Sequence, residues 1–473
     1  MATLPPRTRI GDRVVEGVRQ GPIAVFRGIP YAAPPVGRAG FAAPAPPPGG
    51  AGTLDARAFG PTAPKPAYRP PYDRLLPDPI RPGEDFLTLN VWTPEPGPGA
   101  RLPVLVWLHG GAFTRGTGSN PVYDGGAFAR DGVVAVTLEH RLGALGYALL
   151  PDAPANRGLL DQIAALRWVR AHIAGFGGDP DRVTVCGHSA GAVAVGALLT
   201  APAAEGLFAR AVLQSGAPGA LARERVRAVT RRTARLLRVP ATAAGLAGVP
   251  WERLVAAQTR AQARSVPLLG GPAFGLVRDP ATLPEDPIEA LTRGPAGDRI
   301  PVLTGWTARE HRLWLAPTGA GRRLDRLGRW APEAARRWTG TGRERAAAAR
   351  AADPGAGPAD LAGGLLTDAL LREPLRRWAR ARSARPGAAP VYAYRFDWPS
   401  GLPGLGACHA IEPAFVLDTL DAPGAAWLTG PNPPRELAAR VHAAWVAFVT
   451  GGDPGWPAWD GAGPPRGLGG PGE

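Results

Sequence analysis

The hydrophobic pattern between residues 102 and 214 is typical of a parallel sheet that is covered on both faces. Three apolar runs, at 102–108, 133–138 and 183–186, are short and uninterrupted, as expected of strands with no solvent-facing side. Between the last two runs, residues 159–173 repeat apolar side chains at steps of three or four, which predicts an amphipathic helix. Because strands and helices alternate, the predicted fold class is α/β, with a mostly parallel central sheet flanked by helices.

Segments on both sides of this region predict more of the same sheet and further helices. Residues 220–264 and 324–362 are expected to be mainly helical, and 436–449 is typical of a terminal amphipathic helix. The Gly/Pro-rich tail beyond residue 451 is expected to be loose. No linker or internal repeat divides the chain, so residues 1–473 are predicted to form one domain. The other expected elements are strands at 23–31, 87–92, 211–214, 299–305 and 391–396 and a small-residue helix at 190–199.

The charge balance is strongly basic, with 54 Lys and Arg against 39 Asp and Glu and a formal net charge of +15. Such a surface attracts nucleic acid, anionic lipid or acidic substrates. The arginines are scattered along the chain, however, and no nucleic-acid-binding motif accompanies them, so we expect no nucleic-acid partner. No apolar run has the length of a membrane span, and the N-terminus lacks the apolar core of a signal peptide. A soluble cytoplasmic protein with no membrane partner is therefore predicted.

The two cysteines, Cys186 and Cys408, are too few for a disulfide framework. No cluster of His or Asp ligands accompanies them, so both are interpreted as small buried packing residues and not as a metal or redox site. No GxGxxG fingerprint follows a strand, which gives no sign of a nucleotide. We expect the protein to need neither a metal nor a cofactor.

The sequence GHSAG at 187–191 places Ser189 between a predicted buried strand and a predicted helix. The five letters alone occur by chance in Gly/Ala-rich chains, but a strand–turn–helix context presents the serine Oγ at the apex of a sharp turn. A Cβ on Gly187 or Gly191 would crowd the backbone of so tight a bend. The N-terminus of the helix also directs N–H groups toward a developing oxyanion. Ser189 is therefore the predicted nucleophile.

A second Gly-rich turn, HGGAF at 109–113, follows the first of the predicted buried strands. An acyl-transfer enzyme needs N–H donors for the negative oxygen of its tetrahedral intermediate. The backbone N–H groups of Gly110, Gly111 and Ala190 are predicted to supply them, while His109 is expected to hold the loop. A structural Gly-Gly turn at a strand end is the alternative interpretation, and the nucleophile motif favours the oxyanion hole.

Stretches with a specific pattern occur along nearly the whole chain. The most specific of them is NRGLLDQIAALRWVRAHIAGFGGDPDRVTVCGHSAG at 156–191. In these stretches the chain resembles the type-B carboxylesterase family of cholinesterase-like esterases, and particularly bacterial para-nitrobenzyl esterases. The resemblance implies an α/β-hydrolase fold and a serine esterase that hydrolyses small carboxylic esters. The other matching stretches are FRGIPYAAPPVG (26–37), EDFLTLNVWTP (84–94), LPVLVWLHGGAF (102–113), HRLGALGY (140–147), QSGA (214–217), VYAYRFDWPS (391–400) and GACHAIEPAFV (406–416).

The chain departs from the pattern of this family at positions close to the predicted site. Phe86 stands where the family has a cysteine, so the early disulfide is absent, which agrees with a reducing cytosol. His188 replaces the usual glutamate before the nucleophile, and Glu139 and His140 replace the first two residues of the family's NYRLG. These changes are expected to affect the pH profile and the shape of the pocket while leaving every catalytic group in place.

The α/β-hydrolases order their triad as serine, acid and histidine along the chain, and three histidines follow Ser189. His442 lies in the predicted terminal helix and is expected to be structural or on the surface, while His311 does not match the family's histidine position. His409 lies in the Gly-rich loop GLGACHAIE and matches the catalytic histidine of the family. The resemblance therefore implies that His409 is the general base.

The resemblance implies Glu310 as the acid of the triad. The segment TGWTARE follows a predicted strand and resembles the family's GTNRDEG, with His311 in place of its glycine. In this role Glu310 accepts the Nδ1–H of His409, fixes its tautomer and stabilises the imidazolium. From the residues alone, Asp279 and Glu412 are rival candidates, and only the family match decides among them.

Two alternatives to an esterase are open from the sequence. The same triad also cleaves amide, carbamate or lactone bonds, and the sequence does not distinguish among them. A non-catalytic binding protein on the same fold is the other alternative, but such relatives usually lose the serine, whereas Ser189 is present. Ser215 is a candidate for a hydrogen bond behind the site. Four aromatic residues are candidates for either an apolar pocket or the core: Phe113, Trp306, Trp314 and Phe415.

Overall fold

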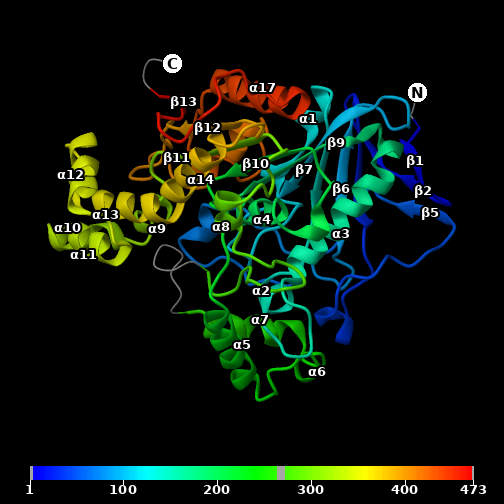
Figure 1. Cartoon of the computed structure of the whole chain (residues 1–473). Coiled ribbons are helices and arrows are strands. Elements are labelled where there is room, and N and C mark those ends of the chain that lie inside the picture. The colour runs from blue at the N-terminus through cyan, green and yellow to red at the C-terminus, as the bar shows by residue number, and fades with distance from the viewer. Residues whose placement is uncertain (1–3, 264–271, 471–473) are drawn as a thin grey trace.

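A ten-stranded sheet forms the centre of the molecule in the computed structural model, which describes residues 4–263 and 272–470 (Figure 1). In spatial order its strands are β13 (Arg466–Leu468), β12 (Val391–Phe396), β11 (Val302–Thr307), β10 (Arg210–Gln214), β9 (Gly178–His188), β7 (Leu102–Leu108), β8 (Val134–Leu138), β6 (Thr88–Thr93), β4 (Ile23–Pro30) and β3 (Val18–Gln20). All neighbours from β13 to β8 are parallel, and the pairings from β8 to β3 are antiparallel. The predicted α/β class with a mostly parallel sheet is confirmed.

Alternate residues of the central strands pack into two hydrophobic cores, one on each face of the sheet. In β7, Val104 belongs to the core that α3 (Arg157–His172) and α4 (Ala190–Leu198) cover. Its neighbour Leu105 belongs to the other core, which α17 (Arg435–Gly451) covers. Because both faces exclude water, these strands are uninterrupted apolar runs and do not alternate between apolar and polar residues.

The segment between β11 and β12 contains a helical arm that projects to one side of the sheet (Figure 1). The arm consists of α10 (Ala320–Arg326), α11 (Trp330–Thr339), α12 (Arg343–Ala352) and α13 (Pro358–Thr367). Glycines such as Gly328 and Gly340 separate its helices, so the helical pattern expected over 324–362 is interrupted where the sequence carries glycine. The arm packs around a small core of its own, formed by Ala331, Ala335, Ala362, Leu365 and Leu366.

Further helices and short turns cover the sheet and its edges. The stretch expected to be helical over 220–264 contains three helices, and residue 264 lies outside the described residues. Within the described ranges, no helix is long and apolar enough to cross a membrane. The remaining helices are α1 (Gly126–Arg130), α2 (Gly143–Tyr147), α5 (Arg223–Leu237), α6 (Ala243–Leu246), α7 (Trp251–Ala261), α8 (Pro287–Arg293), α9 (Arg312–Leu315), α14 (Glu373–Ser383), α15 (Pro413–Val416) and α16 (Ala426–Thr429).

The expectation of a loose tail beyond residue 451 is wrong. The strand β13 pairs in parallel with β12, and Trp459 packs edge-on against Trp306 with ring centroids 5.8 Å apart. A strand of three residues is too short to show a period of two, so the hydrophobic pattern carries no signal for it. A small three-stranded sheet near the N-terminus was not predicted either, and each of its strands has only four residues. Its strands are β1 (Arg7–Ile10), β2 (Arg13–Glu16) and β5 (Gly52–Asp55).

Candidate active site

Ser189 lies at a sharp turn between β9 and α4. Its backbone has φ 57° and ψ −120°, a conformation that L residues rarely adopt. The N–H of Ser189 donates to the carbonyl of Gln214 at 2.8 Å, which holds the turn against β10. A Cβ on Gly187 would lie 2.3 Å from the carbonyl carbon of Gly191, and a Cβ on Gly191 would lie 2.0 Å from the carbonyl oxygen of Leu108. Both positions therefore require glycine, because neighbouring backbone occupies the space of a side chain.

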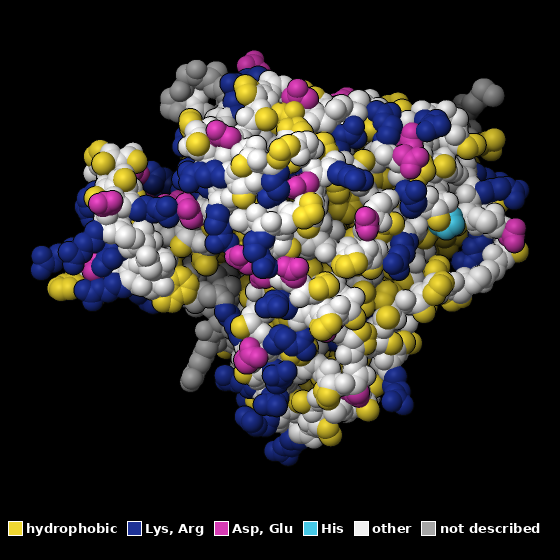
Figure 2. Space-filling view, in the orientation of Figure 1, with side chains coloured by type: hydrophobic (Ala, Val, Ile, Leu, Met, Phe, Trp, Pro, Cys, Tyr) yellow, Lys and Arg dark blue, Asp and Glu magenta, His cyan; other side chains and the backbone are white. Residues whose placement is uncertain are grey.

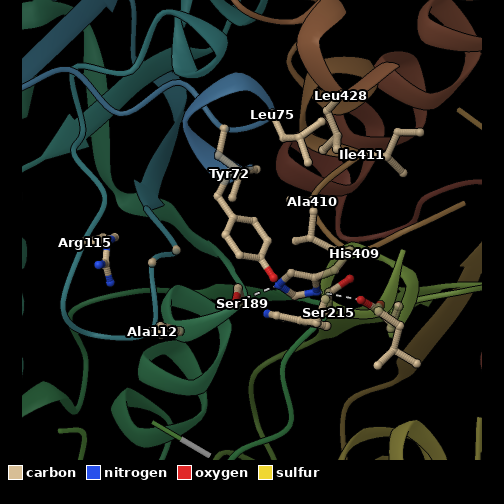
Figure 3. Close-up of a pocket in the computed structure, with 18 of the residues that line it drawn as sticks. Tyr72, Leu75, Ala112, Arg115, Ser189, Ser215, His409, Ala410, Ile411 and Leu428 are labelled. Carbon is tan, nitrogen blue, oxygen red and sulfur yellow. Dashed lines mark hydrogen bonds and ion pairs between the residues drawn. The ribbon is translucent and has the colours of Figure 1, made fainter. Parts of the chain in front are cut away.

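Three side chains form a hydrogen-bonded series at the carboxyl ends of parallel strands (Figure 3). The Oγ of Ser189 lies 2.9 Å from Nε2 of His409, and Nδ1 of His409 lies 2.5 Å from Oε2 of Glu310. Ser189 follows β9, Glu310 follows β11 and His409 follows β12. Because these strands run parallel within one sheet, their carboxyl ends bring together residues that are 220 and 99 positions apart in the sequence.

The carboxyl group of Glu310 is ionised although only 3% of the residue is exposed. Burial raises its pKa, but the charge and hydrogen bond of His409 and the backbone N–H of Thr307 outweigh burial, and the pKa of Glu310 falls to about 2. The Thr307 N–H donates to Oε1 at 2.7 Å. An ionised carboxylate accepts the Nδ1–H of His409 and leaves Nε2 free to accept the hydroxyl proton of Ser189. The geometry thus places an imidazole nitrogen that can accept a proton beside the hydroxyl.

The loop after β7 brings Gly110 and Gly111 close to Ser189. A Cβ on Gly110 would lie 3.1 Å from the Cβ of Ser189. Gly111 has φ 119°, and a Cβ there would lie 2.2 Å from the carbonyl oxygen of Arg115. Ala190 is the first residue of α4, and N–H groups in the first turn of a helix have no intrahelical partner. The three backbone N–H groups predicted as oxyanion donors therefore belong to two segments that meet at Ser189.

A buried ion pair supports the far end of this loop. Lys65 is the only lysine of the chain, and it forms an ion pair with Asp78 and donates to the carbonyl of Gly116 at 2.9 Å. The side chain of Lys65 is fully buried, and that of Asp78 is 4% exposed. Sequence reasoning missed this pair, although a single lysine among 54 basic residues was an available signal.

The near end of the loop is held by His109. Its Nδ1 donates to the carbonyl of Gly110 at 2.8 Å, and its ring stacks on His140 with centroids 4.7 Å apart. Burial, and then the charge of His140, lower the pKa of His109 well below its ordinary value, so the ring is neutral. Next to His140, the buried Glu139 accepts the hydroxyl of Thr117. His109 thus has the contacts expected of a residue that positions the loop.

His188 stands where glutamate was expected, directly before the serine. Its ring lies 4.8 Å from that of His409, between centroids. Burial, and then the charge of His409, lower the pKa of His188 to about 3. Its Nε2 is buried without a hydrogen-bond partner among the described residues. His188 therefore adds no charge next to Ser189, whereas an ionised glutamate would add one.

Glu412, a rival candidate for the acid, belongs to a hydrogen-bonded group separate from that of Ser189, His409 and Glu310. Its Oε1 accepts the hydroxyl of Tyr394 at 2.9 Å and the side-chain N–H of Gln214 at 3.1 Å. The hydroxyl of Ser215 lies 3.5 Å from the same oxygen, at the long end of the hydrogen-bond range. Burial, and then the charge of Glu310, raise the pKa of Glu412 to about 8. The sequence pointed to Ser215 as a candidate for a hydrogen bond behind the site, but not to its partners Glu412, Tyr394 and Gln214.

The other candidate side chains have contacts of their own, apart from Ser189. Asp279 accepts backbone N–H groups within its own turn. Nε2 of His311 lies 2.9 Å from the carboxylate of Asp360 and joins the start of α9 to α13. His442 is buried in α17, where Nδ1 donates to the carbonyl of Val416 at 2.7 Å. The contacts of Asp279, His311 and His442 are those of residues that hold the fold, and none of these contacts joins them to Ser189.

Both cysteines are free and buried. The thiol of Cys186 donates to the side-chain oxygen of Gln214 at 3.1 Å. Burial raises the pKa of Cys408 to about 12, so its sulfur is a thiol and not a thiolate at neutral pH. Within residues 4–263 and 272–470, no group of three or more His, Cys, Asp and Glu side chains is placed to hold a metal ion.

A cavity of about 1450 Å³, lined mainly by apolar side chains, adjoins Ser189 and His409. Phe113 and Trp314 line it, and the ring of Trp314 lies 4.8 Å from that of His409, between centroids. The other two aromatic candidates, Trp306 and Phe415, are buried in the two cores. Residues of several distant segments complete the wall, among them Tyr72, Leu75, Ala112, Arg115, Ile411 and Leu428 (Figure 3).

Comparisons with known sequences point to one family. The sequence profile of the carboxylesterase family matches residues 9–464. The para-nitrobenzyl esterase of Bacillus subtilis is 37% identical over 462 residues, which cover 94% of this chain and 91% of that protein. The phenmedipham hydrolase of Pseudarthrobacter oxydans is also 37% identical, with 94% and 90% covered. The fumonisin B1 esterase of Sphingopyxis macrogoltabida is 35% identical, with 93% and 81% covered.

Comparisons with solved structures agree. A structure of PNB esterase matches with a TM-score of 0.82 at 34% identity and covers 96% of this chain and 93% of its own. A carboxylesterase from Geobacillus stearothermophilus matches with a TM-score of 0.81 at 36% identity, with 96% and 94% covered. The sheet and the helices that hold the site thus follow the α/β-hydrolase arrangement.

Proposed function

This chain belongs to the carboxylesterase family and hydrolyses carboxylic esters, and we propose that it does so through an acyl-enzyme on Ser189, with His409 and Glu310 completing the triad. One observation carries the proposal: Oγ, the imidazole and the carboxylate are joined in series at 2.9 and 2.5 Å. The serine also lies beside a cavity that can hold an ester. A nucleophile, its base and a group that orients the base are the parts that acyl transfer requires.

In the first step, Nε2 of His409 accepts the hydroxyl proton of Ser189 while Oγ attacks the ester carbonyl carbon. The carboxylate of Glu310 stabilises the imidazolium that results. Because the neighbouring His188 is neutral, no second positive charge opposes this protonation. Oγ forms a bond to the carbonyl carbon, and the electron pair of the C=O bond moves to the carbonyl oxygen.

The oxyanion accepts hydrogen bonds from the backbone N–H groups of Gly110, Gly111 and Ala190. These donors are fixed before the substrate arrives, so they stabilise the developing charge without reorganising. The imidazolium of His409 then donates its proton to the alcohol oxygen, the alcohol leaves, and the acyl group stays on Ser189. Water attacks the acyl carbon while His409 accepts its proton, and the carboxylic acid leaves with the serine restored.

A second class of bond has a specific observation in its favour. The relative that is named phenmedipham hydrolase is 37% identical to this chain, which equals the identity of the para-nitrobenzyl esterase. Amides, carbamates and lactones are therefore the bonds to compare with esters by kcat/KM. We expect the highest kcat/KM for the ester. A higher value for any of the other three would replace the ester as the preferred bond.

We propose further that residues 1–473 act as one α/β-hydrolase domain in the cytoplasm. Three strands of one sheet supply the triad, which supports a single unit. The free thiols of Cys186 and Cys408 support a reducing compartment. Figure 2 shows acidic side chains interspersed among the arginines on the visible face, which favours a small-molecule ester and neither nucleic acid nor a membrane as the partner.

A fluorophosphonate probe tests the nucleophile, because it bonds to an activated serine with loss of fluoride. We expect peptide mapping of the labelled protein to find the probe on Ser189 alone. The Ser189→Ala variant should lose both the label and, by roughly 10³-fold or more, the hydrolysis of 4-nitrophenyl acetate. Ser383→Ala, on α14 and exposed, is the matched control and should retain both. A label on another serine of an active wild-type protein would overturn the assignment.

A further inference from the structure

Three arginines, Arg69, Arg115 and Arg323, line the cavity beside the proposed nucleophile. None of the three forms an ion pair with another described residue, although ion pairs are frequent elsewhere on the surface. A guanidinium stays charged at any pH at which the protein is folded. The wall of the cavity therefore carries three cations that form no ion pair with any carboxylate of residues 4–263 and 272–470.

The two carboxylates that line the same cavity are both occupied. Asp78 is paired with the buried Lys65. Glu310 is paired with His409 in the proposed triad. Neither carboxylate is available to the arginines, so the positive charge of the wall remains for a ligand to neutralise.

Arg115 is the most buried of the three arginines and gives the strongest evidence for a carboxylate site. It lies at the end of the loop that contains Gly110 and Gly111, it is half-buried, and its buried Nε has no hydrogen-bond partner among the described residues. The guanidinium stacks over the ring of Tyr68 at 5.1 Å from the centroid, which compensates only part of the cost of burying a charge. A carboxylate in the cavity is the group that matches this side chain, because it can accept two parallel N–H bonds from the two Nη groups of the guanidinium.

Arg323 belongs to the helical arm, whose residues 320–353 contain nine arginines and four carboxylates. Figure 2 shows basic side chains, all of them arginines, gathered on this arm, on the left of the view. Together with Arg323, the half-exposed Leu327 and Trp338 line the part of the cavity that meets solvent. A mouth lined by one sign of charge raises the local concentration of an oppositely charged substrate.

We infer that the preferred substrate is an ester whose acyl part carries a second, free carboxylate, as in the monoester of a dicarboxylic acid. The inference rests on the proposed function, because His409 must reach the oxygen of the leaving alcohol, which places the alcohol on the side of His409. The acyl part then extends to the other side of Ser189, the side on which Figure 3 draws Arg115, across Ser189 from His409. Arg115 holds the free carboxylate, and Arg69 and Arg323 attract it on approach.

Two pairs of substrates test this. On the acyl side, mono-4-nitrophenyl adipate is compared with 4-nitrophenyl hexanoate, which releases the same phenol but carries no second charge. On the alcohol side, 4-acetoxybenzoate is compared with 4-methylphenyl acetate. After correction for spontaneous hydrolysis, we expect kcat/KM at low salt to favour the adipate over the hexanoate by roughly tenfold or more, with no such preference in the second pair.

Variants and salt assign the preference to the arginines. Arg115→Gln should lower the adipate-to-hexanoate ratio most, Arg323→Gln and Arg69→Gln less, because the last two side chains are exposed and their charges are screened. Arg231→Gln, on the exposed face of α5 and away from the cavity wall, should leave the ratio unchanged. High salt should lower the ratio of the wild-type protein without any substitution.

Each result decides one question. If neither ester of the first pair is hydrolysed, the proposed function fails. If both are hydrolysed with equal kcat/KM, the esterase stands and the carboxylate site is overturned. A preference confined to the alcohol-side pair would overturn the placement of the carboxylate on the acyl part. A preference that Arg231→Gln lowers as much as Arg115→Gln would make it a property of the overall charge and would overturn the site.

Discussion

Two regions of the molecule maintain their shape in different ways. One is the edge of the sheet formed by the carboxyl ends of β9, β11 and β12, called the sheet edge below, where the proposed triad lies, and the other is the helical arm. At the sheet edge, backbone segments approach so closely that a Cβ on Gly191 would lie 2.0 Å from a carbonyl oxygen. The arm is held by a small core that is rich in alanine, and Trp330 and Trp338 are 62% and 51% exposed on it. Many close contacts fix the first region, and few apolar contacts fix the second. Substitutions at the edge should therefore change the chemistry, and those on the arm should change which ester binds.

The largest effect is expected from Glu310→Gln at the sheet edge. A neutral amide neither fixes the tautomer of His409 nor stabilises its imidazolium, so kcat should fall by roughly 10⁴-fold with little change in the fold. Glu333→Gln, on the arm, removes an exposed carboxylate of the same type and should leave kcat unchanged. Steady-state kinetics with 4-nitrophenyl acetate measures both. Equal kcat for the wild type and Glu310→Gln would exclude Glu310 from the proposed triad. It would also contradict the distinction between the sheet edge and the arm.

Lys65→Met should cost the most stability. The substitution leaves Asp78 buried and unpaired, and breaking a buried ion pair from one side costs about 3–5 kcal/mol of unfolding free energy. Urea unfolding measures the difference. Arg350→Met, on the exposed face of α12, should change the same quantity by less than about 0.5 kcal/mol. The double substitution Lys65→Met with Asp78→Asn should recover part of the loss, and a single variant as stable as the wild type would contradict the role of the pair.

Gly111→Ala should displace the loop that supplies two of the proposed oxyanion donors. The new Cβ would lie 2.2 Å from the carbonyl oxygen of Arg115 at φ 119°, so the backbone must move. Loss of one donor lowers kcat by roughly 10²–10³-fold. Gly364→Ala is the matched control on the arm, because it lies inside α13 with no atom within 4 Å of the added Cβ. It should leave kcat unchanged and stabilise the protein by roughly 0.5–1 kcal/mol.

Glu412→Gln should change how stability depends on pH. Because the pKa of Glu412 in the folded protein, about 8, lies above its ordinary 4.5, the folded state holds a proton that the unfolded chain releases. The contribution of Glu412 to stability is therefore fully present below pH 4.5 and is lost as the pH rises toward 8, by about 2 kcal/mol between pH 6 and pH 8. Unfolding by urea at both pH values should show a smaller decline in the variant. An identical decline in both proteins would mean that Glu412 is not the responsible group.

The turn at Ser189 was predictable because its determinants, the five-residue motif and the strand and helix on either side of it, are adjacent in the sequence. The acid was not predictable from the residues alone, since Glu310, Glu412 and Asp279 all follow plausible strands or loops. Which carboxylate lies beside His409 depends on the order of β9, β10, β11 and β12 in the sheet, and only the resemblance to a family carried that information. Neighbouring residues determine a turn. The contact between Glu310 and His409, 99 positions apart, depends instead on the order of the strands in the sheet.

The aromatic residues show the same limit in the pocket. Phe113 and Trp314 line the cavity, and Phe113 also belongs to a core, while Trp306 and Phe415 lie in the cores alone. Burial against a core and burial against a cavity that holds a ligand require the same kind of side chain. The free charge at Arg115 was hidden for a related reason, because the missing ion pair is visible only when its neighbours in space are known.

The smallest effect, and the one that separates the two regions most finely, is expected from Trp338→Ser on the arm. The ring lines the mouth of the cavity but is half-exposed, so its loss should lower kcat/KM for 4-nitrophenyl decanoate by about fivefold through lost apolar contact. The acetate is too short to reach the arm, and its kcat/KM should stay the same. Trp330→Ser, which removes an exposed ring that does not line the cavity, should change neither value. If Trp338→Ser lowered kcat/KM equally for both esters, the arm would contribute to the chemical step. The distinction between the arm and the sheet edge would then be wrong.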